Sequence, residues 1–428
     1  MLRVSALSNP RAFVIIAVSS LLAAGVLALV SRAPASVRAE PQDTPADTQP
    51  ELGAEFTDEQ IARHGAYRGP SYLFFALITV LEVLILVTLA RGPFARIVDR
   101  FGGLPGGWLV RAAAATLILV LIMWIATLPM NLVRGYAMEH AWGLSTQNLG
   151  GWISDQLRAT AIGSLVAIVA SLVFFTLVRW QPRSWWLIGW VTFTLLSALL
   201  AFLWPILIAP LFNKFTPLQD PFLRERAFTL AREADVDIDE VLVADASRRT
   251  TTENAYVAGI GASQRLVLYD NLVDDSDPRE VSFVIAHELG HRSENHLIKQ
   301  VLIQSLGLAV GFGVLRLLAG WDRAWEWAGA GSRGIDDVRA LPVLLLVTLV
   351  LGTLSLPLQN AISRRFEEEA DRIAIRLTDD PETAVAAFRR LALANLADLR
   401  PPRIAVEVLF SHPPIPERIR DALAASRS

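Results

Sequence analysis

The sequence contains no cysteine, and this absence removes several classes of chemistry together. Disulfide bonds, thiolate metal ligands and cysteine nucleophiles are excluded, and the redox compartment cannot be inferred from cysteine usage. Charged residues are also scarce, at 19% of the chain, and a net charge of −3 gives no electrostatic basis for binding nucleic acid. Lysine occurs only twice against 37 arginines, which indicates a GC-rich codon bias rather than a function.

Apolar residues are abundant, at 53% of the chain, and the mean hydropathy is positive. A helix that crosses a bilayer needs about 20 largely apolar residues. Seven runs reach or approach that length, at residues 12–30, 72–90, 108–130, 161–178, 185–206, 301–319 and 341–358. Because one soluble core would not bury so many such helices, we predict a mainly α-helical integral membrane protein with seven transmembrane helices.

The first apolar run has features of a secretory signal peptide. Arg3 and Arg11 precede it, and the small residues Ala33-Pro34-Ala35 follow it. The run is longer than the 7–15 apolar residues usual in a signal peptide. We therefore expect residues 1–31 to remain as a first transmembrane helix, a signal anchor, with cleavage as the alternative.

Composition divides the rest of the chain into five segments. We expect an acidic linker at 32–70, transmembrane helices two to five at 71–210, a soluble α+β catalytic part at 211–300, helices six and seven at 301–360, and a helical catalytic tail at 361–428. Within the α+β part, strands are predicted at Val241–Val243, Asn254–Val257 and Arg265–Tyr269. The Gly-Ile-Gly-Ala-Ser segment at 259–263 would join the last two as a hairpin.

The α+β part contains the motif His-Glu-Leu-Gly-His at His287–His291, on a helix that Asp277 and Pro278 are suited to begin. Histidines four residues apart lie on one helical face, so both imidazoles can bind one Zn²⁺. Glu288 can reach a water molecule on the metal and act as general base. The motif predicts a zincin-like catalytic domain.

A catalytic zinc site takes three protein ligands, and this motif supplies two. We expect His64 and His140 to be ordinary surface residues. His296 lies five residues after His291, about 140° around the helix, and is a poor third ligand. The glutamates 367–369, which closely follow the last apolar run, are the leading candidates.

Several stretches together resemble the type I CaaX prenyl endopeptidases, integral-membrane zinc metallopeptidases of the M48 family. The resemblance extends from near residue 50 to the tail, and the predicted number of membrane helices matches that family. It is carried by IAPLFNKFTPL at 208–218, TENAYVAG at 252–259, HELGH at 287–291, SRRFEEEAD at 363–371 and SHPPIPERI at 411–419.

The resemblance implies a complete catalytic site and a fold. One zinc ion per chain would be held by His287, His291 and Glu367, with Glu288 as base. Asp371, one helical turn beyond Glu367, would lie behind the ligands. The membrane helices would surround a water-filled chamber, with the zinc near one end.

The resemblance also implies how a substrate is held. Asn254 and His412 would bind the peptide, and Arg418 would support that site. We expect Glu368 and Glu369 to face solvent or the nearby arginines 364, 365 and 372.

The sequence therefore predicts a membrane zinc endopeptidase that cleaves peptides or membrane-associated proteins and has no nucleic-acid partner. A bacterial source, indicated by the codon bias, favours a wider substrate range than prenylated peptides. The alternatives are an HtpX-like quality-control protease, for which we expect fewer membrane helices, and an inactive scaffold or transporter. Arg111 and Arg316 lie in apolar runs and could line a transport path or a proteolytic chamber.

Two indications disagree about orientation in the cell membrane. The resemblance places the catalytic side in the cytoplasm. Arginines are frequent in the loops opposite the catalytic part, and the positive-inside rule would place those loops in the cytoplasm instead. These arginines are residues 91, 96, 100, 179, 183, 323 and 333. We follow the resemblance and expect a cytoplasmic catalytic side.

Overall fold

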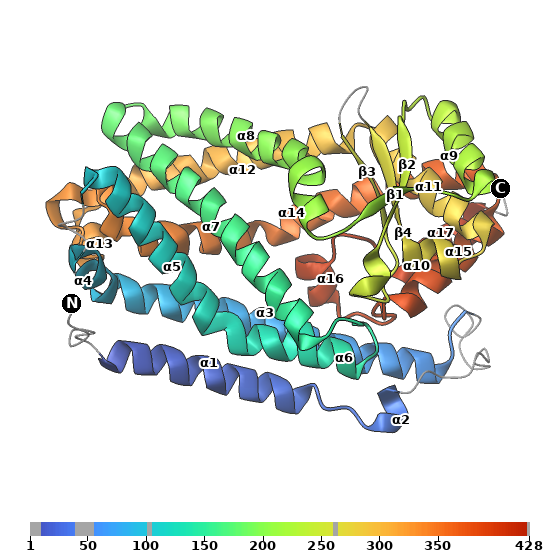
Figure 1. The fold of residues 1–428 in the computed structure, drawn as a ribbon, viewed down its shortest axis with the longest axis horizontal. Helices are drawn as coiled ribbons and strands as arrows, with labels where there is room; N and C mark the ends of the chain where they lie inside the picture. Colours follow the sequence, from blue (N-terminus) through green and yellow to red (C-terminus); the bar gives the residue numbers. More distant parts are fainter. Residues whose placement is uncertain (1–9, 39–54, 101–104, 260–263, 426–428) are drawn as a thin grey trace.

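The computed structural model describes residues 10–38, 55–100, 105–259 and 264–425. Within these residues seven helices are long and apolar enough to cross a membrane, as predicted. They are α1 (Pro10–Val30), α3 (Asp58–Ala90), α5 (Gly107–Leu132), α7 (Leu149–Trp180), α8 (Trp185–Leu203), α12 (His296–Ala319) and α14 (Leu341–Thr378). They run roughly along the long axis of the molecule (Figure 1).

The surface of these helices is suited to hydrocarbon. Large apolar side chains point outward on every one of them, such as Leu21 on α1 (64% exposed) and Leu354 on α14 (72% exposed). Exposure of this extent to water would be costly, whereas a bilayer solvates it. Other apolar side chains, such as Leu27 and Phe175, are fully buried between helices. The described bundle is therefore a mainly helical membrane domain.

An open groove of about 320 Å³ lies between helices of the membrane bundle. Its lining is mostly apolar and comes from α3, α5, α7 and α14, with Glu82, Trp124, Thr127 and Thr160 among the lining residues. The large water-filled chamber implied by the resemblance stays a prediction.

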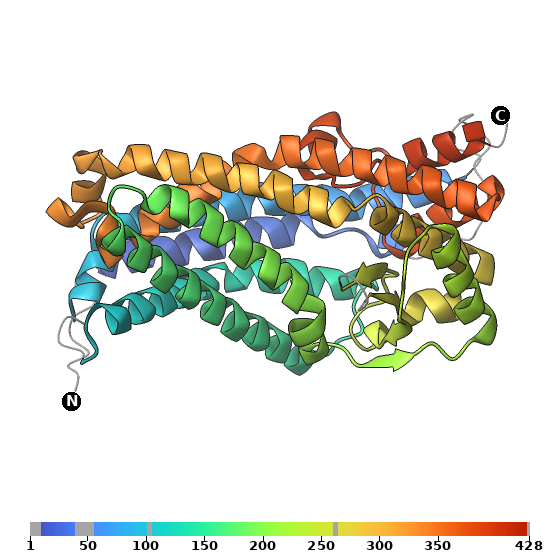
Figure 2. The same ribbon diagram turned by 90° about the horizontal axis from the view of Figure 1, so that it is seen from above.

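Four strands form a small sheet at one end of the molecule (Figures 1 and 2). They are β1 (Phe215–Pro217), β2 (Glu240–Ala244), β3 (Ala255–Ala258) and β4 (Arg265–Tyr269), in the order β1-β2-β4-β3. The pair β2–β4 is parallel, and β1–β2 and β3–β4 are antiparallel. The last pairing is the predicted hairpin, although residues 260–263 of its connection lie outside the described residues. β1 is too short to show an alternating pattern, so the sequence did not indicate it.

Helices pack on this sheet to make the second core of the molecule. They include α9 (Pro221–Glu233), α11 (Pro278–Ser293), α15 (Pro381–Ala394) and α17 (Ile415–Ala425). The rings of Phe283 and Phe388 meet edge-on at its centre, with centroids 5.2 Å apart. The remaining α-helices are short: α2 (Ala35–Arg38), α4 (Pro93–Arg100), α6 (Glu139–Ala141), α10 (Asp270–Asp275), α13 (Asp322–Trp327) and α16 (Arg403–Leu409).

Helix α3 begins earlier than predicted. Thr57 and Gln60 form a capping box, in which the Thr57 side chain accepts from the Gln60 amide and the Gln60 side chain accepts from the Thr57 amide. The part of the predicted linker from Asp58 to Pro70 is therefore helical, and residues 39–54 lie outside the described residues. The sequence contains this capping-box pattern, but we placed the start of the helix at the apolar run that follows, which was too late.

Helix α14 connects the two cores. It has 38 residues and a length of about 57 Å, nearly twice the roughly 30 Å of a bilayer interior. The predicted boundary at residue 360 falls within this continuous helix. The last third of α14 runs along α11, which carries the His-Glu-Leu-Gly-His motif.

Candidate metal centre

The motif helix α11 begins where the sequence predicted. The Asp277 side chain accepts a hydrogen bond of 2.8 Å from the amide of Arg279, and Pro278 occupies the first turn. Gly290 then allows α11 to approach α14, since a Cβ at this position would lie 3.1 Å from the backbone of Ala370. This close approach brings the two motif histidines against the glutamates of α14.

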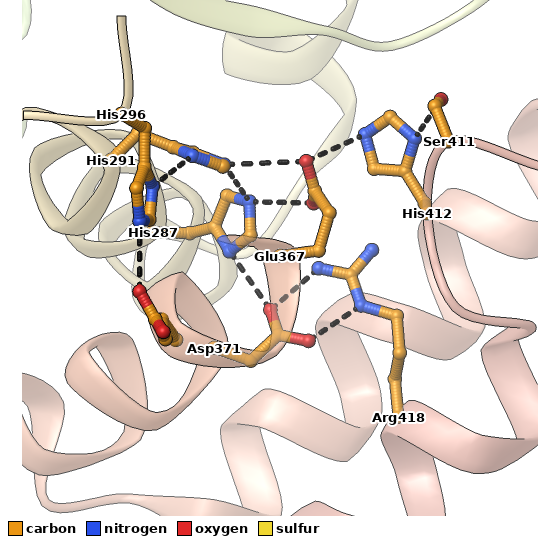
Figure 3. Close-up of polar contacts among 9 residues, drawn as sticks. His287, His291, His296, Glu367, Asp371, Ser411, His412 and Arg418 are labelled. Carbon is orange, nitrogen blue, oxygen red and sulfur yellow. Dashed lines mark hydrogen bonds and ion pairs between the residues drawn. The ribbon is translucent and has the colours of Figure 1, made fainter. Parts of the chain in front are cut away.

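Three donor atoms converge between the two helices (Figure 3). The Nε2 atoms of His287 and His291 are 3.1 Å apart. Glu367 Oε2 is 3.3 Å from His287 Nε2, and Glu367 Oε1 is 3.4 Å from His291 Nε2. Ligands at tetrahedral angles around zinc, at 2.0–2.2 Å from it, are separated by about 3.3–3.6 Å. The three side chains therefore have the spacing and chemistry of a zinc ligand set.

The surroundings of the donors also favour a cation. Glu367 is 6% exposed, and its Oε2 atom is buried. Burial disfavours a charged His287 ring, but hydrogen bonds to Asp371 and Glu367 outweigh burial and raise the pKa of His287 to about 10. The two carboxylates beside His287 thus favour positive charge at this point, which a divalent metal also supplies.

The outer nitrogen of His287 has a charged support. Its Nδ1 lies 2.8 Å from Asp371 Oδ1. Arg418 in turn donates to both oxygens of Asp371, at 2.7 Å and 2.6 Å, and its guanidinium stacks over Phe388. Arg418 therefore acts through Asp371 on the metal group, by which we mean His287, His291 and Glu367. The resemblance had linked Arg418 to the substrate instead. A bidentate pair of this kind fixes the carboxylate, which then orients the imidazole.

Glu288 follows the first histidine and is half-buried. Its burial raises the pKa of Glu288 above the ordinary value of a carboxylic acid, and the neighbouring imidazoles partly oppose that rise. A raised pKa brings a carboxylate closer to neutral pH, where it can both accept and release a proton.

His412 reaches the same group from the C-terminal segment. Its Nε2 lies 3.3 Å from Glu367 Oε1, its Nδ1 lies 2.9 Å from the Ser411 hydroxyl, and its side chain is 59% exposed. It therefore borders the metal group and also faces open space, as a substrate-binding side chain must.

Two α14 residues that we did not single out for this purpose hold the His412 segment in place. Arg364 donates to the carbonyl oxygens of Val406 and Phe410, at 2.8 Å and 2.9 Å. Asn360 donates to the carbonyl of Val408 at 2.6 Å. Positions 360, 364, 367 and 371 share one helical face, and this spacing was the available indication.

Asn254 immediately precedes β3, the edge strand beside β4. It is exposed, and its side-chain oxygen accepts a 2.9 Å hydrogen bond from the amide of Ala255. None of the contacts described for its side chain involves the three donor residues.

His64 is not a surface residue, contrary to prediction. His64 is fully buried on α3, with Nδ1 2.6 Å from the carbonyl of Ala397, because α3 extends to the catalytic end of the molecule. His140 is half-buried and its ring lies over Tyr136. Neither belongs to the metal group.

His296 is outside the ligand set, as expected, but the expected direction of its side chain is wrong. Its Nδ1 lies 2.9 Å from His291 Nδ1. The 140° separation assumed one continuous helix, whereas Asn295 has a left-handed conformation (φ 55°) between α11 and α12. Glu369, expected to face solvent or arginines, lies 3.0 Å from His296 Nε2, while Glu368 is exposed.

Two family models together match most of the chain. Residues 217–426 match peptidase family M48, and residues 38–214 match the CAAX prenyl protease N-terminal model with five membrane helices. A metalloprotease of Bacillus subtilis named YhfN, described as uncharacterized, is 32% identical over 82% of each chain. A CAAX prenyl protease 1 homolog of Arabidopsis thaliana is 31% identical over 69% of each chain.

A solved structure shows the same fold. The crystal structure of Ste24p from S. mikatae aligns with 96% of this chain and 98% of its own, with a TM-score of 0.76 and 22% identity. The match to the five-helix N-terminal model does not favour the HtpX-like alternative. The chain therefore belongs to peptidase family M48, whose members are zinc-dependent, and within it to the membrane metalloendopeptidases of the CAAX prenyl protease type.

Proposed function

We propose that His287, His291 and Glu367 bind one zinc ion and that the chain hydrolyses peptide bonds there, with Glu288 as general base. The observation that carries this proposal is the convergence of two imidazole Nε2 atoms, 3.1 Å apart, with the carboxylate of Glu367, whose two oxygens lie 3.3 Å and 3.4 Å from them. Bound zinc supplies a Lewis acid that lowers the pKa of water and polarises a carbonyl group.

The protein side chains divide the remaining tasks. Glu288 takes a proton from the attacking water and returns it to the leaving amine, which its raised pKa assists. Asp371, clamped by Arg418, holds the proton of His287 on Nδ1 and so keeps Nε2 directed at the metal. His412 can donate from its exposed ring to the substrate backbone.

The open edge of the sheet provides a place for an extended peptide. The amide of Tyr269 donates to the carbonyl of Asn254, so the alternate residues Ala255 and Val257 direct their backbone groups away from β4. A substrate can pair with this edge as an added strand. Asn254 immediately precedes β3, the strand that forms this edge. We therefore propose extended segments of peptides or membrane-associated proteins as substrates, without a required prenyl group.

The proposal is tested by metal analysis and chelation. The purified protein should contain about one zinc per chain and should cleave an unstructured peptide. Removal of zinc by a chelator should abolish cleavage, and stoichiometric zinc should restore it. Full activity in metal-free protein would contradict the proposed chemistry.

Replacement of His412 or Asn254 by alanine is expected to weaken the use of substrate. Each change removes about one hydrogen bond, so kcat/KM should fall by roughly tenfold while zinc content stays constant. Arg403→Ala provides a control, because Arg403 is 93% exposed and belongs to the same C-terminal segment. Loss of zinc from His412→Ala would instead identify His412 as a ligand.

We further propose that the catalytic end faces the cytoplasm. The family resemblance supports this orientation, while the arginine-rich loops at the opposite end favour the reverse. The α4 and α13 segments lie at that opposite end (Figure 1). Alkaline phosphatase fused after Ser428 should be inactive and β-galactosidase fused there should be active. The opposite pattern would place the catalytic end outside the cytoplasm.

A further inference from the structure

A second pair of side chains stands behind the metal group, on the side of His291. His296, the first residue of α12, is 5% exposed, and its two ring nitrogens have separate partners. Nδ1 lies 2.9 Å from His291 Nδ1 (Figure 3). Nε2 lies 3.0 Å from Glu369 Oε2. We propose that His296 and Glu369 are positioning residues that hold the His291 imidazole toward the metal and fix which nitrogen carries its proton. This inference rests on the proposed role of His291 as a ligand.

The positions of the protons follow from the contacts. His291 Nε2 faces His287 Nε2 and Glu367, so it must keep its lone pair to bind a metal. The His291 proton is then on Nδ1, which donates to His296 Nδ1. His296 consequently carries its own proton on Nε2, which donates to the carboxylate of Glu369. Because an ionised carboxylate only accepts hydrogen bonds, this arrangement satisfies every contact in the series.

The His296 ring is held by packing as well as by hydrogen bonds. It stacks on Phe366, with ring centroids 4.3 Å apart and an angle of 15° between the planes. Phe366 immediately precedes Glu367 on α14. The left-handed residue Asn295 turns the chain so that α12 starts with this ring beside His291. Three helices, α11, α12 and α14, therefore fix the position of the His296 imidazole.

Glu369, at the outer end of the series from His291 through His296, is more exposed than Asp371, which has the corresponding place behind His287. Glu369 has a 38% exposed side chain and lies 3.9 Å from the ammonium group of Lys299. Asp371, in contrast, is 8% exposed and is clamped by a buried arginine. His287 therefore donates directly to a fixed carboxylate, whereas His291 donates to a neutral ring that a half-exposed carboxylate orients. Replacing His296 should therefore weaken zinc binding more than replacing Glu369.

The test measures zinc affinity, which does not depend on turnover. Full-length protein in detergent is depleted of metal and titrated with zinc against a competing chelator. His296→Phe keeps a flat ring against Phe366 and removes both nitrogens. It should weaken zinc binding by about 10–100-fold, the range typical of losing a partner behind a metal ligand. Glu369→Gln should weaken binding less, and Glu368→Gln, at the exposed neighbouring position, should leave binding unchanged.

Two further variants separate positioning from general structural damage. His296→Asn keeps an acceptor near the position of Nδ1, so it should recover much of the affinity that His296→Phe loses. In the double variant, Glu369→Gln should add little to His296→Phe, because Glu369 acts through His296. The thermal midpoint of the metal-free protein should be similar in all variants. If His296→Phe does not fold, the same test uses His296→Asn. Its zinc affinity is compared with that of the double variant that combines His296→Asn and Glu369→Gln.

The outcomes are distinguishable from failure of the proposed function. Unchanged zinc affinity in His296→Phe, or full additivity in the double variant, would overturn the positioning role even if the enzyme cleaves peptides normally. A wild-type chain that binds zinc but cleaves no peptide would instead contradict the proposed function and leave the affinity comparison intact.

Discussion

Glu288→Gln is expected to lower kcat by about 10²–10⁴-fold while the protein keeps one zinc per chain. The glutamine side chain has the same shape as the glutamate but cannot accept the proton that water loses. The three donors of the metal group are unaffected, since Glu288 is not among them. Peptide-cleavage rates and zinc analysis on the same preparation measure both effects.

A matched control for this substitution is Glu233→Gln, at an exposed position on α9. It removes the same charge from the soluble end of the protein and should leave kcat unchanged. A near-normal kcat in the Glu288 variant, with zinc present, would exclude Glu288 as the base.

Glu367→Ala should remove most of the bound zinc and abolish cleavage. Only the two imidazoles would remain as ligands. Without the Glu367 carboxylate, the positive charge of a bound zinc ion would also be uncompensated in a buried site. Zinc content by atomic absorption and residual activity measure the result.

Glu368→Ala is the control on the next residue of the same helix. Glu368 is exposed, so this change should keep stoichiometric zinc and most activity, with stability altered by about 0.5 kcal/mol or less. The reverse result, with zinc lost from the Glu368 variant and kept by the Glu367 variant, would mean that the proposed register of the third ligand is wrong.

What could be predicted from the sequence depended on how local each feature is. The pairing of His287 with His291 is set by the period of one helix, and the membrane spans by hydropathy over about 20 residues. The third donor lies some seventy residues further along, and helical spacing alone left Glu367 and Glu368 open. The resemblance favoured Glu367, and the structure places it with the two histidines.

The features that sequence reasoning missed depend on a change of chain direction. Asn295 interrupts the helix after α11, and a break of one residue redirects every side chain that follows it. Asparagine just after a helix end is a known indication of such a break, because it tolerates the left-handed conformation. Without that break His296 would point away from His291, and Glu369 would have no imidazole to contact. The early start of α3, which buries His64, was missed because apolar runs mark membrane spans and not their polar extensions.

The continuity of α14 has a consequence for how this sequence can change during evolution. Asn360, Arg364, Glu367 and Asp371 all act from one face of one uninterrupted helix. Deleting or inserting a single residue among them would turn the following side chains by about 100° and move them by about 1.5 Å. Related chains should therefore differ here by substitution and keep the number of residues fixed from 360 to 371. Differences in length should instead accumulate in connections outside this helix.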